Sequence, residues 1–480
     1  MSIKKIVESL LLLTIVCFGS LMMILLSLKW KLVYIAAIGL LALVLGSRNK
    51  NDVLFALLLV TLCFRIDKKF LFFPYMGGSI GLRIGFEDVL IISIFMVNLW
   101  NPDFSFFRRA RRLSRIVVPW CILLAVSLLS NVNSGVPLSG IGLMMDMIRC
   151  FLLFILAANY FTNEKRISNA IVLLAITVII QGAITIYQYK TSSLIPGLRY
   201  LGQHDDLYQE SWLPEEHIRA GGTRGGPNDL AGYMVLILPV VMAMIVQKKG
   251  AARGLMAASV LLGITSMIFT FSRSGWGCIV IAFTIFGIMF LSREGTKGKI
   301  APAIVLVCFV FLGIFHYFPL IKMRLSSGDY GSSLSRIPLM VNSINAIMDN
   351  PFLGVGINNY SASIAKYDTT GVYKESSYRG GEYPVHNILL LHFAELGIAG
   401  GLVFCWLWIA CLREVACSAF GGNRLWSIVA MGGLSGMLGQ FVFYQVHWGY
   451  FESYLPFWVV LALCVGWKNH LDVAVEHRFG

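Results

Sequence analysis

Four side chains able to do chemistry stand where polar loops meet apolar segments. They are Arg219, Arg273, Arg336 and His386. Guanidinium groups bind anions such as a diphosphate through paired hydrogen bonds. An imidazole with a pKa near neutrality can accept the proton of an incoming hydroxyl group. Together these residue types suit a transfer reaction on a lipid-linked sugar diphosphate, with the arginines on the leaving group and the histidine as base.

The histidine lies near the start of a segment, Tyr383 to Gly401, that starts polar and becomes strongly apolar. We predict that an apolar helix continues from it to about residue 411. If this helix includes His386, steps of three and four residues place the imidazole on the face of Gly397. Small residues on that face allow close packing between membrane helices. Glu395 falls on the opposite face, so we expect it to pair inside the bundle and not with His386.

The first arginine lies in a glycine-rich stretch. Arg219 and Arg224 belong to Arg-Ala-Gly-Gly-Thr-Arg-Gly-Gly-Pro-Asn, which leads into a helix expected to begin near Asn228. Backbone amides at a helix start bind anions, as arginines do, so this stretch suits an anionic ligand. Arg224 and Asn387, the residue after the histidine, are candidate supporting residues.

Each of these residues also has an ordinary structural explanation. Glycine-rich turns are common, and Arg273 in its tight turn could extend toward the lipid headgroups. Arg336 could be a solvated charge, and His386 could hydrogen-bond the backbone at a helix end. A single shared site therefore requires all four residues to lie at the same face of a membrane.

A metal site is the main chemical alternative. Neither acidic cluster of the first polar loop has the spacing of a known metal motif, and loop acids are normally solvated. We therefore predict no metal and no other cofactor. The ligand-type side chains concerned are His204, Asp205, Asp206, Glu215, Glu216 and His217.

The composition is that of a polytopic membrane protein. Of 480 residues, 57% are hydrophobic and 13% are charged, and many apolar runs approach the roughly 20 residues that cross a bilayer. The net charge of +14 does not indicate nucleic acid binding, because most basic residues lie in short loops between apolar runs. The ten cysteines lie in or beside apolar segments and show no disulfide framework.

We predict an all-α fold with about 12–14 transmembrane helices, two of them short. The short segments are 32–47 and 53–64. The others are 9–28, 86–100, 116–131, 143–161, 168–189, 228–247, 255–271, 276–292, 300–318, 387–411, 426–445 and 455–467.

Basic residues in short loops predict the orientation. The densest cluster, Arg108 to Arg115, should be cytoplasmic, and strict alternation then places both termini in the cytoplasm. Arg65 to Lys69 is the exception, since alternation places it outside. The expected parts are N-terminal helices 1–189, a first outer loop 190–227, helices 228–318, a large outer (periplasmic) loop 319–385, C-terminal helices 386–467 and a cytoplasmic tail 468–480.

The large outer loop should contain one amphipathic helix that ends at Asn350-Pro351. Such a helix could lie in the lipid interface as a lid. Its apolar residues at helical spacing are Leu339, Met340, Ile344, Ile347 and Met348.

These motifs resemble those of the O-antigen ligase and polymerase family of bacterial membrane glycosyltransferases. The family signature is a His followed by Asn, Ser or Gln, nine residues and Gly-x-x-Gly, and here it reads His386-Asn387 to Gly397-Ile-Ala-Gly400. Three further stretches resemble the family's Asn-Pro…Gly-x-Gly…Phe/Tyr element, its Ser-Arg-Gly turn and its first-loop element. They are Asp349 to Tyr360, Phe271 to Gly275, and Arg219 to Asn228. The resemblance is sharpest from about 219 to 411, and Arg224 replaces a residue that is usually aromatic.

The resemblance implies a GT-C-like enzyme of the cell (inner) membrane. Such an enzyme transfers a glycan from undecaprenyl diphosphate to an acceptor hydroxyl at the outer face, with inversion and without a metal. By position, Arg219, Arg273 and Arg336 would bind the diphosphate and His386 would act as the base. The implied partners are the undecaprenyl-diphosphate-linked donor, a glycan, lipid or protein acceptor, and membrane lipids.

The sequence leaves the acceptor open. Family members include ligases that build lipopolysaccharide, polymerases of polysaccharide repeat units and protein O-oligosaccharyltransferases. A rival from another class is a transporter or flippase of lipid-linked sugars, which would need charges lining a cavity through the bundle. Asp146 and Arg149 fit that rival, although a pair three residues apart on one helix is the simpler explanation.

Overall fold

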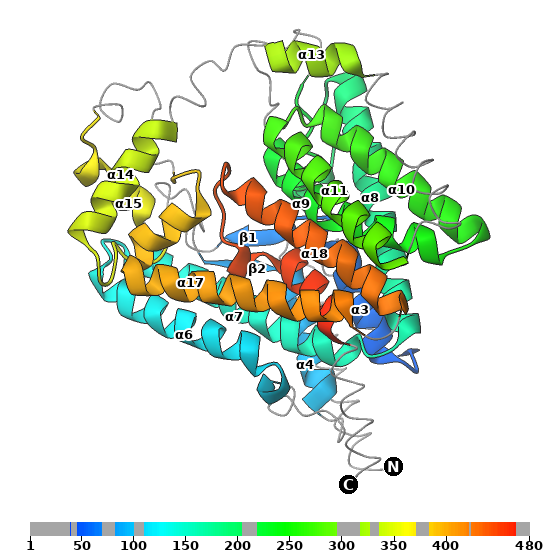
Figure 1. Ribbon diagram of the computed structural model, residues 1–480, viewed down its shortest axis with the longest axis horizontal. Helices are drawn as coiled ribbons and strands as arrows, with labels where there is room; N and C mark the ends of the chain where they lie inside the picture. Colours follow the sequence, from blue (N-terminus) through cyan, green and yellow to red (C-terminus); the bar gives the residue numbers. More distant parts are fainter. Residues whose placement is uncertain are drawn as a thin grey trace, which may run out of the picture. The chain divides into compact units, whose positions relative to one another are not determined.

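A computed structural model describes residues 46–69, 82–99, 110–203, 218–294, 317–326, 336–370, 384–421 and 424–466, together with residue 39 (Figure 1). The chain divides into two compact units, Met1–Phe55 and Ala56–Gly480. The packing and the candidate site described below belong to the second unit.

Long apolar helices make up most of the described chain. Eight of the helices in these parts are long and apolar enough to cross a membrane, and a shorter apolar helix covers Leu455–Gly466. The predicted all-α polytopic fold is therefore confirmed. The eight are α6 (Ser114–Ser130, extended by a 3-10 turn to Asn133), α7 (Pro137–Tyr160), α8 (Glu164–Thr191), α9 (Pro227–Gln247), α10 (Gly250–Phe269), α11 (Arg273–Glu294), α17 (Ile388–Phe420) and α18 (Arg424–Tyr444).

Shorter elements fill the remaining described parts. They are α3 (Lys50–Thr61), α4 (Phe86–Leu99), α13 (Phe318–Ser326), α14 (Arg336–Asp349), α15 (Tyr360–Tyr367) and an antiparallel ribbon of β1 (Asp67–Lys69) and β2 (Arg83–Gly85). The expected segment 9–28, and almost all of 32–47 and 300–318, lie outside the described residues. The total of 12–14 transmembrane helices therefore stays a prediction.

Local sequence signals set several helix starts. Proline is the first residue of α7 and of α9, where its missing N–H has no helical partner to lose. Asn163 caps α8 by accepting from the amide of Arg166 at 2.9 Å, and Asn387 caps α17 by accepting from the amide of Leu390 at 2.9 Å.

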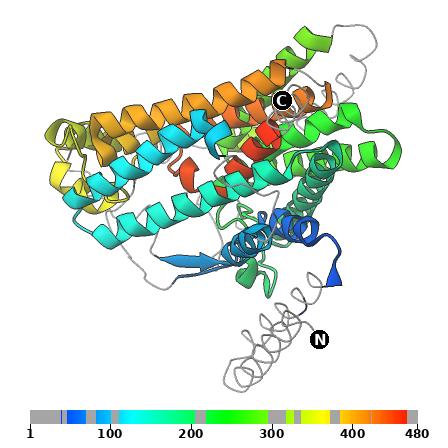
Figure 2. The ribbon, with the colours of Figure 1, turned by 90° about the horizontal axis from the view of Figure 1, so that it is seen from below.

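Helix α17 is broken within its length. It runs alongside α6 in both views of the ribbon (Figures 1 and 2). At Gly397 the backbone has φ 71° and ψ −176°, a conformation outside the helical region. Only glycine adopts such angles without strain, because it has no Cβ. The first glycine of the Gly-x-x-Gly motif therefore interrupts the helix.

The loop between α14 and α15 supplies hydrogen-bond partners for the backbone groups of α17 that lose their helical partners at this break. Val355 donates from its amide to the carbonyl of Ala394 at 2.9 Å, and Gly356 donates to the carbonyl of Glu395 at 3.1 Å. In return, Ile398 donates to the carbonyl of Pro351 at 2.8 Å. Within a membrane, backbone groups need such partners inside the protein. The Asn-Pro and Gly-x-Gly stretch is thus a backbone partner for the broken helix.

Side chains fix the same loop to α17 and to the connection between α6 and α7. Glu395 is buried, and its carboxylate accepts from the amide of Tyr360 at 3.1 Å and from the hydroxyl of Tyr450 at 2.8 Å. Asn133 donates to the carbonyl of Gly354 at 2.6 Å, and the amide of Val136 donates to the side chain of Asn359 at 2.8 Å. Glu395 therefore binds inside the bundle, as expected from the sequence.

The predicted amphipathic helix is α14, but α13 and α15 accompany it in the region expected to hold one helix. Polar Asn342 and Ser343 are buried against its neighbours, and Tyr360 donates from its hydroxyl to the carbonyl of Leu339 at 2.9 Å. Five apolar residues on the other side are exposed, which is the arrangement expected of a helix in a lipid interface. They are Ile337, Met340, Val341, Ile344 and Met348.

Gly397→Ala should destabilise the protein. An added Cβ would clash with the backbone of Phe352, and the required φ and ψ cost a non-glycine residue about 1–3 kcal/mol before any clash. We expect a clearly lower Tm in detergent. Gly277→Ala on α11 is the matched control, because a Cβ there meets nothing within 4 Å and alanine favours a helix. Equal Tm values for the two variants would show that the break does not depend on glycine.

Candidate functional site

Two buried glutamines of α8 hold the glycine-rich loop that carries Arg219. Gln181 accepts from the amide of Thr223 at 3.1 Å and donates to the carbonyl of Cys63 at 2.7 Å. Gln188 accepts from the amide of Gly222 at 2.9 Å. Since both side chains are buried, these bonds are shielded from water and fix the loop's course. The predicted first-loop element is therefore an ordered part of the bundle.

Arg219 joins this loop to two helix ends. Its Nε donates to the carbonyl of Thr270 at 3.0 Å, and Nη2 donates to the side chain of Asn228 at 3.1 Å. Asn228 is the second residue of α9, whose start carries the positive end of the helix dipole. Arg219 is thus placed at a helix N-terminus, beside the turn that leads to Arg273.

That turn connects α10 to α11 and is shaped by a non-glycine residue in a left-handed conformation, Phe271 with φ 51°. Arg273 is the first residue of α11 and is half-buried. A further arginine reaches the turn, since Nε of Arg324 in α13 donates to the carbonyl of Phe271 at 3.3 Å. Sequence reasoning missed Arg324, whose only signal was a basic residue in the large loop.

His386 lies just before α17 and not within it. The expectation that it shares a helical face with Gly397 is therefore wrong, because Asn387 ends the extended segment and caps the helix. Nδ1 of His386 is 3.1 Å from the carbonyl oxygen of Pro384. A carbonyl can only accept, so Nδ1 carries the proton and Nε2 keeps its lone pair in the neutral ring.

The surroundings of His386 favour this neutral form. Burial, the neighbouring ring of His447 and the charge of Arg336 together lower the pKa of His386 from 6.5 to about 4. The imidazole is therefore uncharged at neutral pH and can accept a proton on Nε2. The charge of Arg336, which belongs to a different element, therefore acts on His386.

His447 is a second histidine that the sequence analysis missed. It follows α18, and its ring centre is 6.2 Å from that of His386, at an interplanar angle of 70°. Its Nε2 is 3.9 Å from Oδ1 of Asp229, the neighbour of Asn228 in α9. His447 thus connects the surroundings of His386 to the start of α9. The available signal was a run of polar and aromatic residues between the last two apolar segments.

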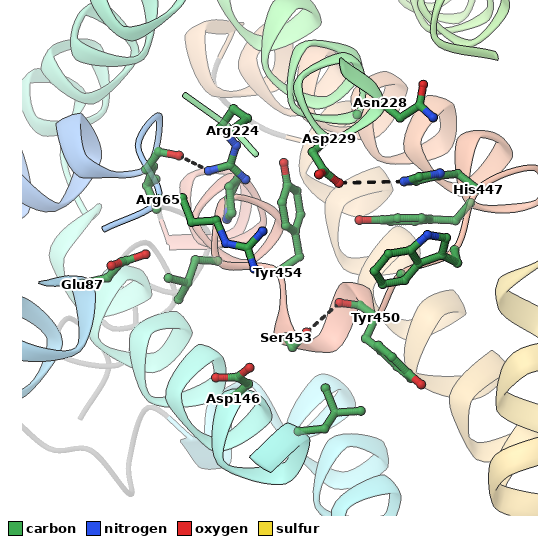
Figure 3. Close-up of a pocket in the computed structure, with 18 of the residues that line it drawn as sticks. Arg65, Glu87, Asp146, Arg224, Asn228, Asp229, His447, Tyr450, Ser453 and Tyr454 are labelled. Atoms are coloured by element: carbon green, nitrogen blue, oxygen red, sulfur yellow. Dashed lines mark hydrogen bonds and ion pairs between the residues drawn. The ribbon is translucent and has the colours of Figure 1, made fainter. Parts of the chain in front are cut away.

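A cavity of about 200 Å³ lies beside these groups (Figure 3). We call it the Asp229 cavity, because the side chain of Asp229 is 50% exposed and lines it together with His447. Its charged lining comes from α4, α7, α9, the β-ribbon and the two loops that carry Arg65 and Arg224. Those charged residues are Arg65, Arg83, Glu87, Asp146, Arg149, Arg224 and Asp229.

Arg224 faces this cavity and not the group around Arg219. Its Nη1 donates to the carbonyl of Leu62 at 2.6 Å. Its guanidinium carbon lies 5.1 Å from the ring centre of Tyr233 and 5.6 Å from that of Tyr454, distances typical of cation–π contacts. Arg224 is therefore held by aromatic rings, and its predicted support of the arginine site stays a prediction.

Most of the other charges in the cavity are paired. Asp146 accepts from Arg149 at 3.1 Å, the pair expected from the sequence, and also from Arg83 at 3.1 Å. Arg149 binds Asp88 of α4 as well, at 3.1 Å. One ion-pair network therefore connects α7, α4 and the β-ribbon.

The described contacts connect most of the predicted site. A chain of neighbours runs from Arg336 to His386, through His447 to the start of α9, and on to Arg219. Arg273 is linked to it through the turn at Thr270. Asn387 has a clear structural function as the cap of α17.

For the metal alternative, residues 204–217 lie outside the described residues, so their arrangement is not tested. Within the described ranges, no group of three or more His, Cys, Asp or Glu side chains is close enough together to hold a metal ion.

Residues 257–405 match the family model of the O-antigen ligases. Over this segment the chain is similar to the O-antigen ligase family. The match includes Arg273, Arg336, His386 and Gly397, and it confirms the resemblance found in the sequence. This similarity supports an enzyme of a membrane-glycosyltransferase-like class. Among curated proteins, none matches the chain.

Within this O-antigen ligase segment, His386 should titrate near pH 4, well below a free histidine. Arg336→Gln and His447→Gln should each raise its pKa toward 6.5, because each removes a charge or dipole that disfavours the imidazolium ion. Histidine-selective ¹³C NMR can follow this, since the chain has eight histidines. A wild-type pKa at or above 6.5 would contradict the arrangement of charges around His386.

Proposed function

We propose that the protein transfers a glycan from undecaprenyl diphosphate to an acceptor hydroxyl at the outer face of the cell membrane. The observation that carries the proposal is the orientation of His386. Nδ1 donates its proton to the carbonyl of Pro384, so Nε2 is available as a base within the electrostatic influence of a positively charged residue, Arg336. A base beside anion-binding groups is what hydroxyl attack on a sugar diphosphate requires.

The arginines would act on the leaving group. Breaking the bond between the anomeric carbon and the diphosphate oxygen leaves both electrons on the diphosphate, whose charge grows in the transition state. Arg219 at the start of α9, Arg273 at the start of α11 and Arg336 at the start of α14 can stabilise that charge more strongly than they stabilise the ground state.

His386 would act on the acceptor. As the acceptor oxygen attacks the anomeric carbon, its proton passes to Nε2 of His386. Attack from the side opposite the diphosphate inverts the anomeric configuration in a single displacement. No metal is needed in this scheme, because arginines supply the positive charge.

The acceptor could be a lipid, a growing polysaccharide or a protein, and the site residues do not favour one of these. A transporter of lipid-linked sugars is less well supported. The cavity charges that it would need are held in ion pairs among Arg83, Asp146, Arg149 and Asp88, whereas a transporter has no need of a base with a directed lone pair.

His386→Ala should remove most transfer while undecaprenyl diphosphate still binds, since the arginines remain. Loss of a general base typically costs on the order of a hundredfold to ten-thousandfold in rate. His386→Gln keeps the shape but supplies no base, so it should fail equally. The assay uses purified protein and the undecaprenyl-diphosphate glycan extracted from the cells that make it, with excess chelator present.

Arg219→Lys should weaken donor binding, because a lysine cannot reproduce the paired geometry of a guanidinium group. Arg253→Lys is the matched control: Arg253 is exposed and lies at the opposite end of α10 from the turn. Full transfer by His386→Ala would contradict the mechanism, as would loss of wild-type activity on chelation.

The predicted orientation can be tested separately. A cysteine replacing Thr369, an exposed residue after α15, should react with an impermeant maleimide added to whole cells. A cysteine replacing Ser292, exposed near the other end of α11 from Arg273, should not. Both are made after the exposed Cys121 and Cys417 are changed to serine. Labelling at 292 but not at 369 would reverse the proposed topology.

A further inference from the structure

The Asp229 cavity has walls of both charges, which limits what can occupy it. An anion would meet the carboxylates of Glu87, Asp146 and Asp229, and a cation would meet four arginines. Either ion would be repelled by part of the lining at short range. The charge pattern therefore favours a guest that is polar and uncharged.

Buried polar atoms on this lining call for both donors and acceptors. Among the described residues, Oε2 of Glu87, Nε of Arg149 and Nε of Arg224 are buried and have no hydrogen-bond partner. Buried polar atoms are normally hydrogen-bonded, so these three residues, which line the cavity, each have unused hydrogen-bonding capacity. The carboxylate oxygen needs a donor and the two guanidinium nitrogens need acceptors. A hydroxyl group serves as either.

Aromatic side chains complete the lining. Tyr444, Trp448, Tyr450 and Tyr454 all border the cavity, from the end of α18 and the segment that follows it. The flat face of an aromatic ring can pack against the C–H groups of a sugar ring. A few polar groups then fix the orientation of the sugar. With a volume of about 200 Å³, and about 30 Å³ per water molecule, the cavity has room for several waters or one sugar ring.

The cavity adjoins the proposed reaction centre. Asn228 lines it and accepts from Arg219 at 3.1 Å. His447 lines it too, and its ring centre is 6.2 Å from that of His386. A ring held here would lie between the proposed diphosphate-binding arginine and the proposed base.

We propose that the Asp229 cavity is a carbohydrate subsite that binds one sugar ring of a substrate. The inference rests on the proposed function, since it gives the cavity one of that reaction's sugars. The hydroxyl groups bind Glu87, Arg149 and Arg224, and the ring packs against Trp448. The ring belongs either to the donor, next to the diphosphate, or to the acceptor.

Direct binding tests the subsite. Methyl glycosides of common hexoses and N-acetylhexosamines are the probes, measured by saturation-transfer NMR with the purified protein in detergent. At least one glycoside should bind the wild type, and Glu87→Gln should weaken it roughly tenfold or more, since hydrogen bonds to charged groups are strong. Trp448→Leu should weaken it as well. Trp406→Leu, on the exposed face of α17, is the matched control and should not.

The outcomes separate the two proposals. If no glycoside binds, or if variants with unchanged Tm bind as the wild type does, the cavity holds water and the subsite is refuted. Undecaprenyl diphosphate without a sugar should bind both cavity variants normally, so its loss in Arg219→Lys reports on the proposed function alone. In the transfer assay, a KM raised for the donor or for the acceptor identifies which substrate supplies the ring. A rise in neither refutes the subsite.

Discussion

The break in α17 creates the constraint on which the rest of the site depends. A break in a buried stretch of helix leaves carbonyl and amide groups that need partners within the protein. Here the backbone from Pro351 to Gly356 supplies those partners, so the loop must lie against the helix. That loop connects α14 to α15, and α14 begins with Arg336. The hydrogen bonds at Gly397 thereby help to set where Arg336 lies relative to His386.

Arg336 would have two electrostatic effects under the proposed function. Burial lowers the pKa of His386 most, and His447 and the charge of Arg336 lower it further. Arg336 would therefore bind the leaving group and also help to keep the base in its neutral form. When a diphosphate is bound, its negative charge would offset Arg336 and raise that pKa, which makes the imidazole a stronger base in the complex than in the free protein.

Periodicity and length predicted the described apolar helices of 114–294 and 388–466 to within a few residues at most ends, because a membrane-spanning helix is specified by its own sequence. The candidate residues were found in the same way, from residue type and position at the segment ends. The break at Gly397 was missed, since a glycine in an apolar run is equally compatible with close helix packing. His447, Arg324 and the bonds between Arg83 and Asp146 were missed because they depend on which distant segments meet. Local sequence does not encode that pairing.

The single hydrogen bond from His386 to the carbonyl of Pro384 has a kinetic consequence. With Nδ1 occupied, the ring has one nitrogen through which protons both arrive and depart. In the proposed reaction the transferred proton would rest on Nε2, facing the newly formed glycan, while Nδ1 stays bonded to the carbonyl of Pro384. Loss of that proton to water would then require the glycan to leave. Release of the glycan and recovery of the base would be coupled, and the rate of turnover should respond to solvent deuterium even where the bond-forming step does not limit it.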